Sequence, residues 1–251
     1  MPLIAAKDKT MSSNFIYRRV LLKVSGEALK GENEFGYDSN AVRILVDNLS
    51  KIIDEGIELG LVVGAGNIWR GEFGKKLGME PIKADYMGML GTIMNSLSLK
   101  DAFERKGVSC EVMTSIPMSP IGQPFDHTKA EKFLEEGRVV IFGGGTGHPF
   151  FTTDTTAALR SLEIGAEAVL KATKVDGIYS ADPMKDSKAV RYEKISYDDA
   201  LYQNLKVMDS TAFSLCRDNN MPIIVFNFSD PHNLTKVLCG HTDIATVVSN
   251  S

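Results

Sequence analysis

A glycine-rich loop in the middle of the chain is the strongest candidate for chemistry. It contains Gly143, Gly144, Gly145 and Gly147 and continues through three threonines to Asp154. An apolar segment precedes it and a helix-like run follows it. Because a helix start presents free backbone N–H groups and the positive end of a dipole, this order favours binding of an anion such as phosphate. The alternative is a tight strand–helix turn in which glycine only supplies positive φ, but one turn rarely needs four glycines.

Two further glycine loops also follow apolar segments. Residues 17–24 lead into Ser25-Gly26, and residues 59–63 lead into Gly64-Ala65-Gly66-Asn67. In an open parallel sheet the carboxyl ends of the strands share one edge, where ligands bind. The three loops therefore predict one extended site rather than three separate sites.

The common nucleotide-binding motifs do not match these loops. Gly26 and Gly31 have the spacing of a P-loop, but Glu32 stands where that motif needs lysine. The loop after residue 63 lacks the third glycine of the dinucleotide fingerprint, because Trp69 occupies its place. By motif, the chain is neither a P-loop enzyme nor a Rossmann dehydrogenase.

Four cations lie close to the loops. Lys23 is the next-to-last residue of the first apolar segment, so it is either a snorkelling edge residue or a phosphate ligand. Its place at a strand end beside a glycine favours the phosphate. Arg70 follows Gly66 by four residues. It either contacts an anion held by that loop or is an ordinary surface arginine, and the sequence favours neither interpretation. The same two interpretations apply to Lys171 and Lys174.

Two aspartates and one histidine complete the polar candidates. Asp154 and Asp209 each stand at an expected helix start, where aspartate commonly caps the helix with a contribution of about 1 kcal/mol. A capping aspartate can also orient a lysine. His148 lies inside the glycine-rich loop, where a lone histidine more often hydrogen-bonds the loop than acts as a base. The methionine-rich run 82–105 favours a core or subunit interface over a cofactor site.

Apolar periodicity predicts strands that alternate with helices along the chain. Strands are expected at residues 17–24, 59–63, 108–113, 138–142, 168–171, 223–228 and 245–248. Helices are expected at residues 39–55 with Ser39 as cap, 82–105, 128–136, 154–164, 196–204, 209–219 and 233–238. Most strands are continuous apolar runs, which predicts an α/β fold with a mainly parallel sheet covered on both faces. A hairpin is expected around Asp176-Gly177 and a soft lobe boundary near residue 172.

Composition narrows the class of protein. The 251 residues carry a net charge of −4, which gives no support for nucleic-acid binding. Three distant cysteines (Cys110, Cys216, Cys239) and four scattered histidines predict neither a disulfide framework nor structural zinc. No apolar run approaches the ~18 residues of a membrane span. Residues 1–14 are expected to be a disordered extension rather than a signal peptide, and the cytoplasm is the expected location.

Six stretches of the chain together resemble the amino acid kinase family and, within it, the bacterial UMP kinases (uridylate kinases). They are 21-LLKVSGEAL-29, 64-GAGNIWRG-71, 85-DYMGML-90, 146-TGHPFFTTD-154, 171-KATKVDGIYSADP-183 and 207-VMDSTAF-213. The similarity runs from residue 17 to residue 248. The 171–183 stretch is typical of the whole family, whereas 146–154 and 207–213 are typical of its UMP-specific branch.

The resemblance implies a three-layer αβα sandwich that transfers the γ-phosphate of ATP to UMP, giving UDP for pyrimidine nucleotide biosynthesis. The implied catalytic residues are Lys23, Arg70, Asp154 and Asp209. The implied ATP-binding residues are Lys23, Val24, Ser25, Gly26, Gly66, Arg70, Thr173, Tyr179 and Asp182. The implied UMP-binding residues are Ala65, Asp85, Thr146, Gly147, His148, Pro149, Phe150, Phe151, Thr152 and Thr153.

The implied reaction needs alignment and charge neutralisation more than covalent chemistry. Lys23, Arg70, the loop N–H groups and a Mg²⁺ ion carried with ATP would neutralise the transferred group, and no metal ligands are expected from the protein itself. A UMP phosphate is a nucleophile near neutral pH, so no general base is implied. The resemblance further implies a homohexamer with GTP as activator and UTP as inhibitor. The residues matching that regulation are Gly31, Glu32, Asn33, Glu34, Phe35, Gly36, Lys100 and Asp101.

Four residues depart from the family pattern. Ala65 replaces the middle glycine of a Gly-Gly-Gly-Asn loop, which places a methyl group near the expected UMP phosphate. His148 stands where asparagine is common, and Lys100 and Glu104 stand where arginine and histidine are common. The alternative within the family is a kinase that phosphorylates a carboxylate or carbamate. A non-catalytic nucleotide sensor is disfavoured because Lys23 is present.

Overall fold

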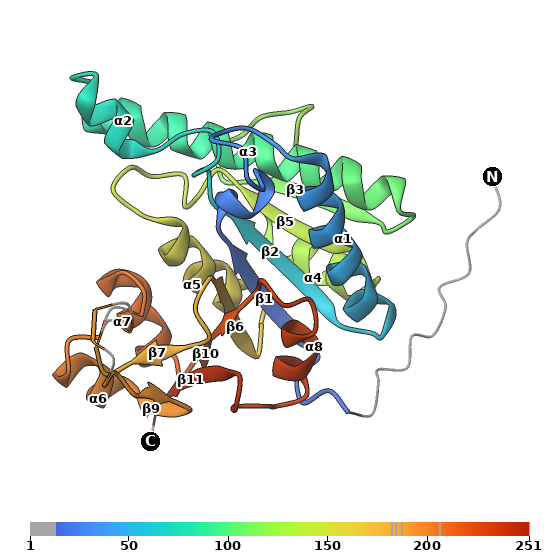
Figure 1. Cartoon of the computed structure of the whole chain (residues 1–251). Coiled ribbons are helices and arrows are strands. Elements are labelled where there is room, and N and C mark those ends of the chain that lie inside the picture. Colours follow the sequence, from blue (N-terminus) through green and yellow to red (C-terminus); the bar gives the residue numbers. More distant parts are fainter. Residues whose placement is uncertain (1–13, 182, 184, 187, 206, 251) are drawn as a thin grey trace.

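A twisted sheet forms the centre of the molecule (Figure 1). The computed structural model describes residues 14–181, 183, 185–186, 188–205 and 207–250. Among these residues, nine strands form the sheet in the order β4-β3-β5-β2-β1-β6-β10-β11-β9. Their bounds are β1 (Arg19–Val24), β2 (Glu58–Val63), β3 (Cys110–Thr114), β4 (Gln123–Pro124), β5 (Val139–Gly143), β6 (Ala168–Thr173), β9 (Lys194–Ser196), β10 (Ile223–Asn227) and β11 (Ala245–Ser249).

Most of the sheet is parallel, as the continuous apolar runs predict. Every neighbouring pair from β4 to β10 is parallel, β11 runs antiparallel to β10, and β9 is parallel to β11. All residues of β2 and β5 are buried, because helices cover both faces of these strands. The parallel strands therefore end at one common edge, and the loops after β1, β2, β5 and β6 all begin there.

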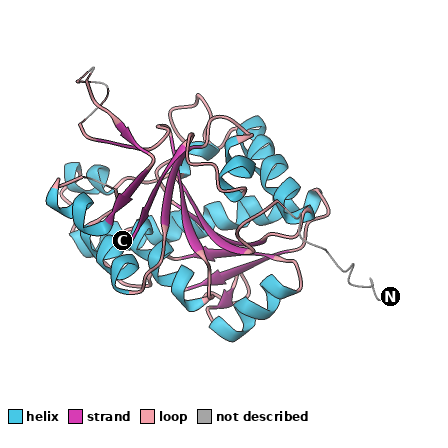
Figure 2. Cartoon of the chain, turned by 90° about the horizontal axis from the view of Figure 1, so that it is seen from below, coloured by secondary structure: helices cyan, strands magenta, loops and turns pink. Residues whose placement is uncertain are grey.

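Helices form a layer on each face of the sheet (Figure 2). One face packs against α1 (Ser39–Asp54), α3 (Pro81–Arg105) and α8 (Asn233–Leu238). The other face packs against α4 (His127–Glu135), α5 (Thr153–Glu163), α6 (Tyr197–Tyr202) and α7 (Ser210–Asp218). Alternate residues of β1 divide between the two cores: Leu22 belongs to the first and Leu21 to the second. This is the expected three-layer αβα sandwich.

Helix α1 shows how the local sequence fixes an element. Its apolar residues recur at helical spacing and are buried against the sheet, as predicted. The cap differs from the expectation: Asp38, not Ser39, precedes the helix, and its Oδ1 accepts the N–H of Ala41 at 2.7 Å. Both residues are good caps by type, and the structure places Asp38 at the cap position.

Several short elements were not predicted. They are the 3-10 turn Gly26–Leu29, the helix α2 (Gly71–Lys76), and the strands β4 and β9. The hairpin expected around residues 176–177 is displaced: β7 (Ile178–Tyr179) pairs with β8 (Arg191–Tyr192), so its turn lies further along the chain. Ile178 donates its N–H to Thr246 at 2.8 Å, which anchors β7 to β11 and shifts the turn.

Two expectations about organisation, the N-terminal extension and the lobe boundary, remain predictions. Residues 1–13 of the expected N-terminal extension lie outside the described residues. The soft lobe boundary near residue 172 falls within β6, whose neighbours β1 and β10 belong to the same sheet. Within the described residues, no helix combines the length and the apolar character needed to cross a membrane.

Candidate active site

The three glycine loops meet at the common edge of the sheet, as predicted from their positions after strands. We name them the first loop (residues 25–32), the second loop (64–70) and the third loop (143–152). A Cβ atom built on Gly26 would lie 2.3 Å from the carbonyl oxygen of Gly64. One built on Gly64 would lie 3.7 Å from the hydroxyl of Thr153, the first residue of α5 after the third loop. Only glycine permits the approach of the first two loops, so Gly26 has a steric reason to be glycine.

A cluster of three charged side chains lies beneath this junction, and we call it the charged centre. Lys23 and Lys171 are direct neighbours across β1 and β6. The Nζ of Lys23 lies 2.9 Å from Oδ1 of Asp154, and the Nζ of Lys171 lies 2.7 Å from Oδ2 of the same carboxylate. These side chains are only 14%, 16% and 14% exposed, in the order Lys23, Lys171, Asp154. Two cations thus share one anion, leaving a net positive charge.

Asp154 is an ion-pair partner rather than a helix cap. The cap of α5 is Thr152, whose hydroxyl accepts the N–H groups of Asp154 and Thr155. Burial alone would raise the pKa of Asp154, but the charges of Lys23 and Lys171 outweigh it and hold the pKa below its usual value. Burial lowers the pKa of Lys171, and the attraction of Asp154 offsets only part of that change. The carboxylate is therefore ionised at neutral pH.

Asp209 connects α7 with the third loop. Its carboxylate caps α7 by accepting the N–H of Ala212 at 2.9 Å, as expected for an aspartate at a helix start. The same carboxylate accepts hydrogen bonds from the hydroxyls of Thr152 and Thr155. Lys171 donates to the carbonyl of Val207, just before this cap, at 2.6 Å. The N-terminal ends of α5 and α7 therefore both lie beside the charged centre, where their dipoles favour an anion.

Arg70 and Lys174 reach the same acidic side chain from opposite sides. The Nη2 of Arg70 lies 2.7 Å from Oε1 of Glu27, and the Nζ of Lys174 lies 3.3 Å from its Oε2. Arg70 also donates to the carbonyl of Gly66 at 3.3 Å. Because the Arg70 side chain is about half exposed and the Lys174 side chain mostly exposed, these pairs contribute little to stability. A phosphate at the junction of the loops would compete with Glu27 for Arg70.

The third loop is a glycine ribbon followed by two exposed aromatic side chains. Gly144, Gly145 and Gly147 all have positive φ, as does Phe150 at 70°. Asp85 of α3 accepts the backbone N–H of Phe150 at 2.8 Å, which fixes this unusual conformation. The loop therefore leads from β5 to α5 and is hydrogen-bonded to α3 on the way.

Residues 18–227 match the family model described as the amino acid kinase family. The chain belongs to the amino acid kinase family.

Solved structures of the family are similar over nearly the whole chain. The UMP kinase of Bacillus anthracis has a TM-score of 0.90 and 38% identity, covering 94% of this chain and 97% of that chain. The UMP kinase of Ureaplasma parvum has a TM-score of 0.89 and 37% identity, with coverage of 93% and 99%. The uridylate kinase of Archaeoglobus fulgidus has a TM-score of 0.70 and 28% identity, with coverage of 92% and 99%.

The alanine that departs from the family's glycine loop points toward a helix. A Cβ atom built on Gly91 of α3 would lie 2.9 Å from the Cβ of Ala65. The methyl group of Ala65 therefore fills the space that Gly91 leaves open. This packing does not support the expected crowding of a UMP phosphate by that methyl group.

The second departure, His148, takes part in the backbone turn of the third loop. Its N–H donates to the hydroxyl of Thr146 at 3.3 Å, and that hydroxyl donates to the carbonyl of His148 at 3.3 Å. The imidazole is on an exposed residue. Both hydrogen bonds use the backbone of His148, so the expected role of its imidazole stays a prediction.

The residues expected at ATP lie around β6 and the β7–β8 hairpin. The hydroxyl of Thr173 donates to the carbonyl of Val175 at 2.6 Å, and Tyr179 donates to Asp176 at 2.7 Å. Val24 and Ser25 lie at the end of β1, where Val24 accepts the N–H of Gly64 at 3.0 Å. Asp182 lies outside the described residues. The structure thus brings Thr173 to the common edge, while Tyr179 lies on the hairpin beside it.

The residues expected to serve regulation fall in two separate places. The 31–36 stretch is tied to the second loop, because Gly36 and Asn67 exchange hydrogen bonds of 2.7 and 3.0 Å. Lys100 lies 3.5 Å from Glu111, and Asp101 pairs with Arg105 on the surface of α3. Only the 31–36 stretch therefore contacts the candidate site directly.

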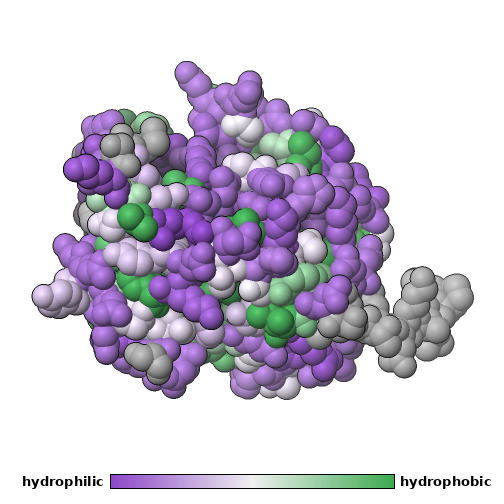
Figure 3. Space-filling model, turned by 60° about the horizontal axis from the view of Figure 1, so that its bottom comes forward, coloured by the Kyte–Doolittle hydropathy of each residue, from purple (hydrophilic) through white to green (hydrophobic). Residues whose placement is uncertain are grey.

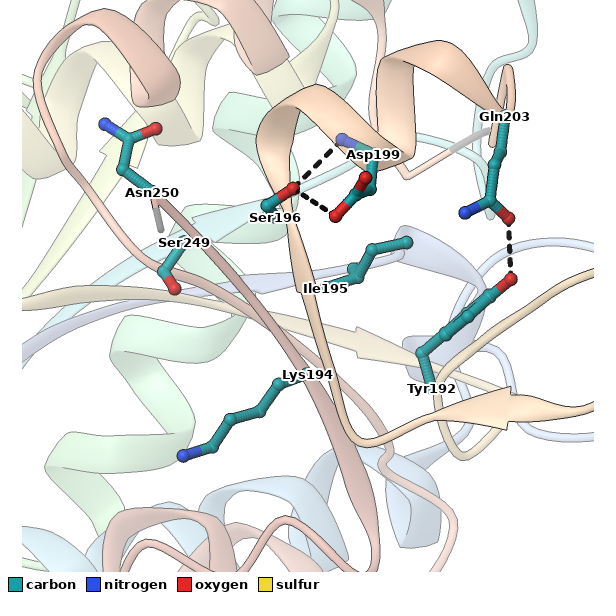
Figure 4. A pocket seen from close by; sticks show the side chains of 8 residues that line it. All are labelled: Tyr192, Lys194, Ile195, Ser196, Asp199, Gln203, Ser249 and Asn250. Carbon is teal, nitrogen blue, oxygen red and sulfur yellow. Dashed lines mark hydrogen bonds between the residues drawn. The ribbon is translucent and has the colours of Figure 1, made fainter.

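The cavity in Figure 4 lies away from this site. It encloses about 320 Å³. It is lined by Tyr192, Lys194, Ile195, Ser196, Asp199, Gln203, Ser249 and Asn250. Since β9 and β11 run opposite to β10, their carboxyl ends lie at the other edge of the sheet. Two pairs of its lining side chains are hydrogen-bonded to each other: Ser196 with Asp199, and Tyr192 with Gln203.

Two parts of the site carry no decisive signal in the sequence. Lys171 was ambiguous from sequence, and its neighbour in register on β1, Lys23, is the signal that resolves it. The amides of Asn67 and Asn95 were not singled out: they are buried and hydrogen-bonded to each other, and Asn95 donates to Gly64 at 2.7 Å. One asparagine lies on a loop and the other on a helix, and nothing in the sequence around either residue indicates that they pair.

Proposed function

We propose that this protein is a UMP kinase, which transfers the γ-phosphoryl group of ATP to UMP and yields ADP and UDP. Family membership and close similarity to solved UMP kinases support this function. The observation that carries it most directly is the charged centre at the junction of the three loops. It provides buried positive charge where phosphates of two nucleotides would meet. The product UDP places the enzyme in pyrimidine nucleotide biosynthesis.

In the proposed mechanism, the charged centre stabilises the transferring group. Lys23 and Lys171 neutralise charge on the phosphoryl oxygens, and Asp154 holds both ammonium groups in place. Arg70 exchanges Glu27 for a phosphate at the junction of the loops. The phosphate of UMP is the nucleophile and is already anionic near neutral pH, so no general base is needed. Asp209 fixes the threonines at the start of α5.

The two substrates approach the charged centre from opposite sides. The third loop and Asp85 would receive the uracil and ribose of UMP, while Thr173, Tyr179 and the first loop would receive ATP. Mg²⁺ would arrive on the ATP phosphates and help to neutralise them. Among the described residues, no cluster of three or more His, Cys, Asp or Glu side chains could hold a metal by itself. We expect the protein to orient the phosphates that carry the ion, through Lys23, Lys171 and the loop N–H groups.

A coupled assay of ADP release tests the function. The protein is offered UMP, CMP, aspartate and glutamate derivatives as acceptors, each with MgATP. We expect turnover with UMP and at least tenfold lower kcat/KM with the others. A preference for aspartate or a glutamate derivative would instead support the sibling activity within the family, which the similarity to UMP kinases does not favour.

We also propose self-association into a homohexamer, supported by an unpartnered face of α3. Large apolar side chains recur along one side of this helix with mostly four-residue spacing, and all are exposed. They are Ile82, Tyr86, Leu90, Met94 and Leu97. By contrast, the face of the molecule in Figure 3 carries hydrophobic residues only in small separate groups. An exposed apolar stripe of this length indicates a protein interface.

Sedimentation velocity at several concentrations tests the assembly. The wild-type protein is expected to sediment as one large species, and the double variant Leu90→Glu/Met94→Glu as smaller ones. Both positions are exposed, so the fold should survive the change. A wild-type protein that stays monomeric at every concentration would refute the hexamer.

Control by GTP as activator and UTP as inhibitor is part of the same proposal. The link between Gly36 and Asn67 supports it, because it connects the 31–36 stretch to the second loop. Initial rates at fixed UMP and ATP, measured with and without each effector, test it. Rates that neither nucleotide changes would remove this regulation, and fractionation of cells tests the expected cytoplasmic location.

A further inference from the structure

The third loop has little intrinsic rigidity. Gly144, Gly145 and Gly147 each adopt positive φ. Glycine loses more conformational freedom on ordering than any other residue. Three glycines within four residues therefore need contacts from outside the loop to hold a single shape.

Ser115, which follows β3, forms the floor of this loop. Its Oγ donates to the carbonyl of Gly145 at 2.5 Å, and its own N–H donates to the carbonyl of Gly143 at 3.1 Å. A Cβ built on Gly147 would lie 3.2 Å from the Cβ of Ser115. On the α3 side, Thr92 accepts the N–H of Gly144 at 2.9 Å. One hydroxyl on each side thus anchors the ribbon.

Arg160 lies directly behind Ser115 and is almost wholly buried. Its side chain is 5% exposed, and its Nη2 donates to the Oγ of Ser115 at 2.8 Å. The guanidinium carbon lies 3.6 Å from the ring centroid of Phe125, and Nη1 pairs with Glu163. A hydroxyl has one hydrogen to donate. Because Ser115 accepts from Arg160, that hydrogen is directed to Gly145.

Packing alone does not explain an arginine at this place. Its Nε is buried and has no hydrogen-bond partner among the described residues, and an unsatisfied buried donor is unfavourable. An apolar side chain of similar volume would avoid that unfavourable term. It could not donate to Ser115, however, so the polar role of Arg160 is directed at the third loop.

We propose that Arg160 is a positioning residue for the acceptor nucleotide. Acting through the hydroxyl of Ser115, it fixes Gly145 and the following turn in the shape that receives UMP. This inference rests on the proposed function in assigning UMP to the third loop. It makes the buried side of α5, as well as its exposed start, part of the acceptor site.

The test is a double-mutant cycle of Arg160→Met and Ser115→Ala, with steady-state kinetics for both substrates. Each single variant is expected to raise KM for UMP about tenfold, with KM for ATP changed less than twofold. If Arg160 acts through Ser115, the double variant should be no worse than either single variant. Ser161→Ala is the matched control, because that buried hydroxyl on α5 donates only within its own helix, to Ala158.

A role confined to stability would give a different pattern. The variants would then lose thermal stability while KM for UMP stayed unchanged, or the two single effects would simply add. Either outcome overturns the proposal. Arg160→Lys keeps a buried cation and covers the case in which Arg160→Met does not fold.

Hydrogen exchange separates this proposal from the proposed function. Peptides covering residues 143–151 should exchange faster in Arg160→Lys and Ser115→Ala than in the wild type, whichever acceptor the enzyme uses. A wild type that does not phosphorylate UMP, combined with faster exchange in the variants, would refute the function but keep the positioning. Unchanged exchange in both variants would refute the positioning itself.

Discussion

The charged centre and the third loop meet at one site but are held in place by different means. Lys23 and Lys171 lie on adjacent central strands, and Asp154 lies in the first turn of a capped helix, so regular elements hold all three. The third loop has left-handed glycines and depends on side-chain contacts from Asp85, Thr92 and Ser115. Strands supply the geometry needed for charge stabilisation, whereas a loop held by separate contacts can be tuned to one acceptor.

The largest effect should follow from removing a cation of the charged centre. Lys23→Ala is expected to lower kcat by at least ~10²-fold, because preorganised charge at a transferring phosphoryl group is lost. KM for UMP should change much less, since the third loop is untouched. Lys51→Ala, on the surface of α1, is the control, and rapid-quench or coupled assays measure both constants. An unchanged kcat would exclude Lys23 from catalysis.

Replacing Asp154, the carboxylate that Lys23 and Lys171 share, should shift the pH profile of kcat in a defined direction. In Asp154→Asn, Lys171 loses the attraction that partly offsets its burial, so its already lowered pKa falls further. A lysine loses its charge as the pH rises through its pKa. The alkaline limb of the kcat profile should therefore move to lower pH, and kcat near pH 7 should fall about tenfold. A profile whose alkaline limb does not move would contradict the assigned pairing.

Asp154 also makes a contribution to stability that depends on pH. Its pKa is lowered on folding, so this contribution is present above the unfolded pKa and is lost as pH falls through the folded pKa. The wild type should therefore lose more stability on acidification than Asp154→Asn. Thermal melts between pH 7 and pH 3 measure the difference.

In the third loop, removing one hydrogen bond that holds the loop should change KM for UMP more than kcat. Asp85→Ala removes the acceptor for the N–H of Phe150 and is expected to raise KM for UMP about tenfold, the size of one charge-assisted hydrogen bond. Asp85→Asn keeps an oxygen acceptor and should be milder. If kcat falls and KM for UMP stays constant, the proposed division of roles, with catalysis at the charged centre and acceptor binding at the third loop, is wrong.

The smallest effect is expected at the residue that departs from the family's glycine loop. Because the methyl group of Ala65 packs on Gly91, Ala65→Gly should change KM for UMP less than about twofold. The free energy of unfolding of this variant should fall by about 1 kcal/mol or less, the scale of an alanine-to-glycine change. A large drop in KM would instead mean that the methyl group obstructs the acceptor.

The sequence predicted the regular parts of this molecule better than the contacts between them. Continuous apolar runs identified the central strands, and α8 begins and ends where its periodicity indicated. The positions of the three loops after strands predicted their convergence. Elements without a periodic apolar pattern could not be predicted. Helix α2 and strand β9 are too short to show one, and the β7–β8 hairpin is held by a hydrogen bond from Ile178 to the distant Thr246.

Within the site, what could be predicted depended on how far apart the partners lie along the chain. Lys23 was identifiable from its place at a strand end, but its equivalence with Lys171 depends on the register of β1 and β6. Arg160 lies 45 residues from Ser115, and nothing in either local sequence links them. Pairing across such distances is set by packing of the layers, which spacing in the sequence does not encode.

The contact between Ala65 and Gly91 has a consequence for how this enzyme tolerates variation. A methyl group fits at position 65 or at position 91, since Cβ atoms on both would lie 2.9 Å apart. The two positions therefore form an epistatic pair: Gly91→Ala should be harmful in this background and tolerated once residue 65 is glycine. A sequence that evolves to carry the methyl group at position 91 instead of position 65 would therefore acquire Ala65→Gly first and Gly91→Ala second.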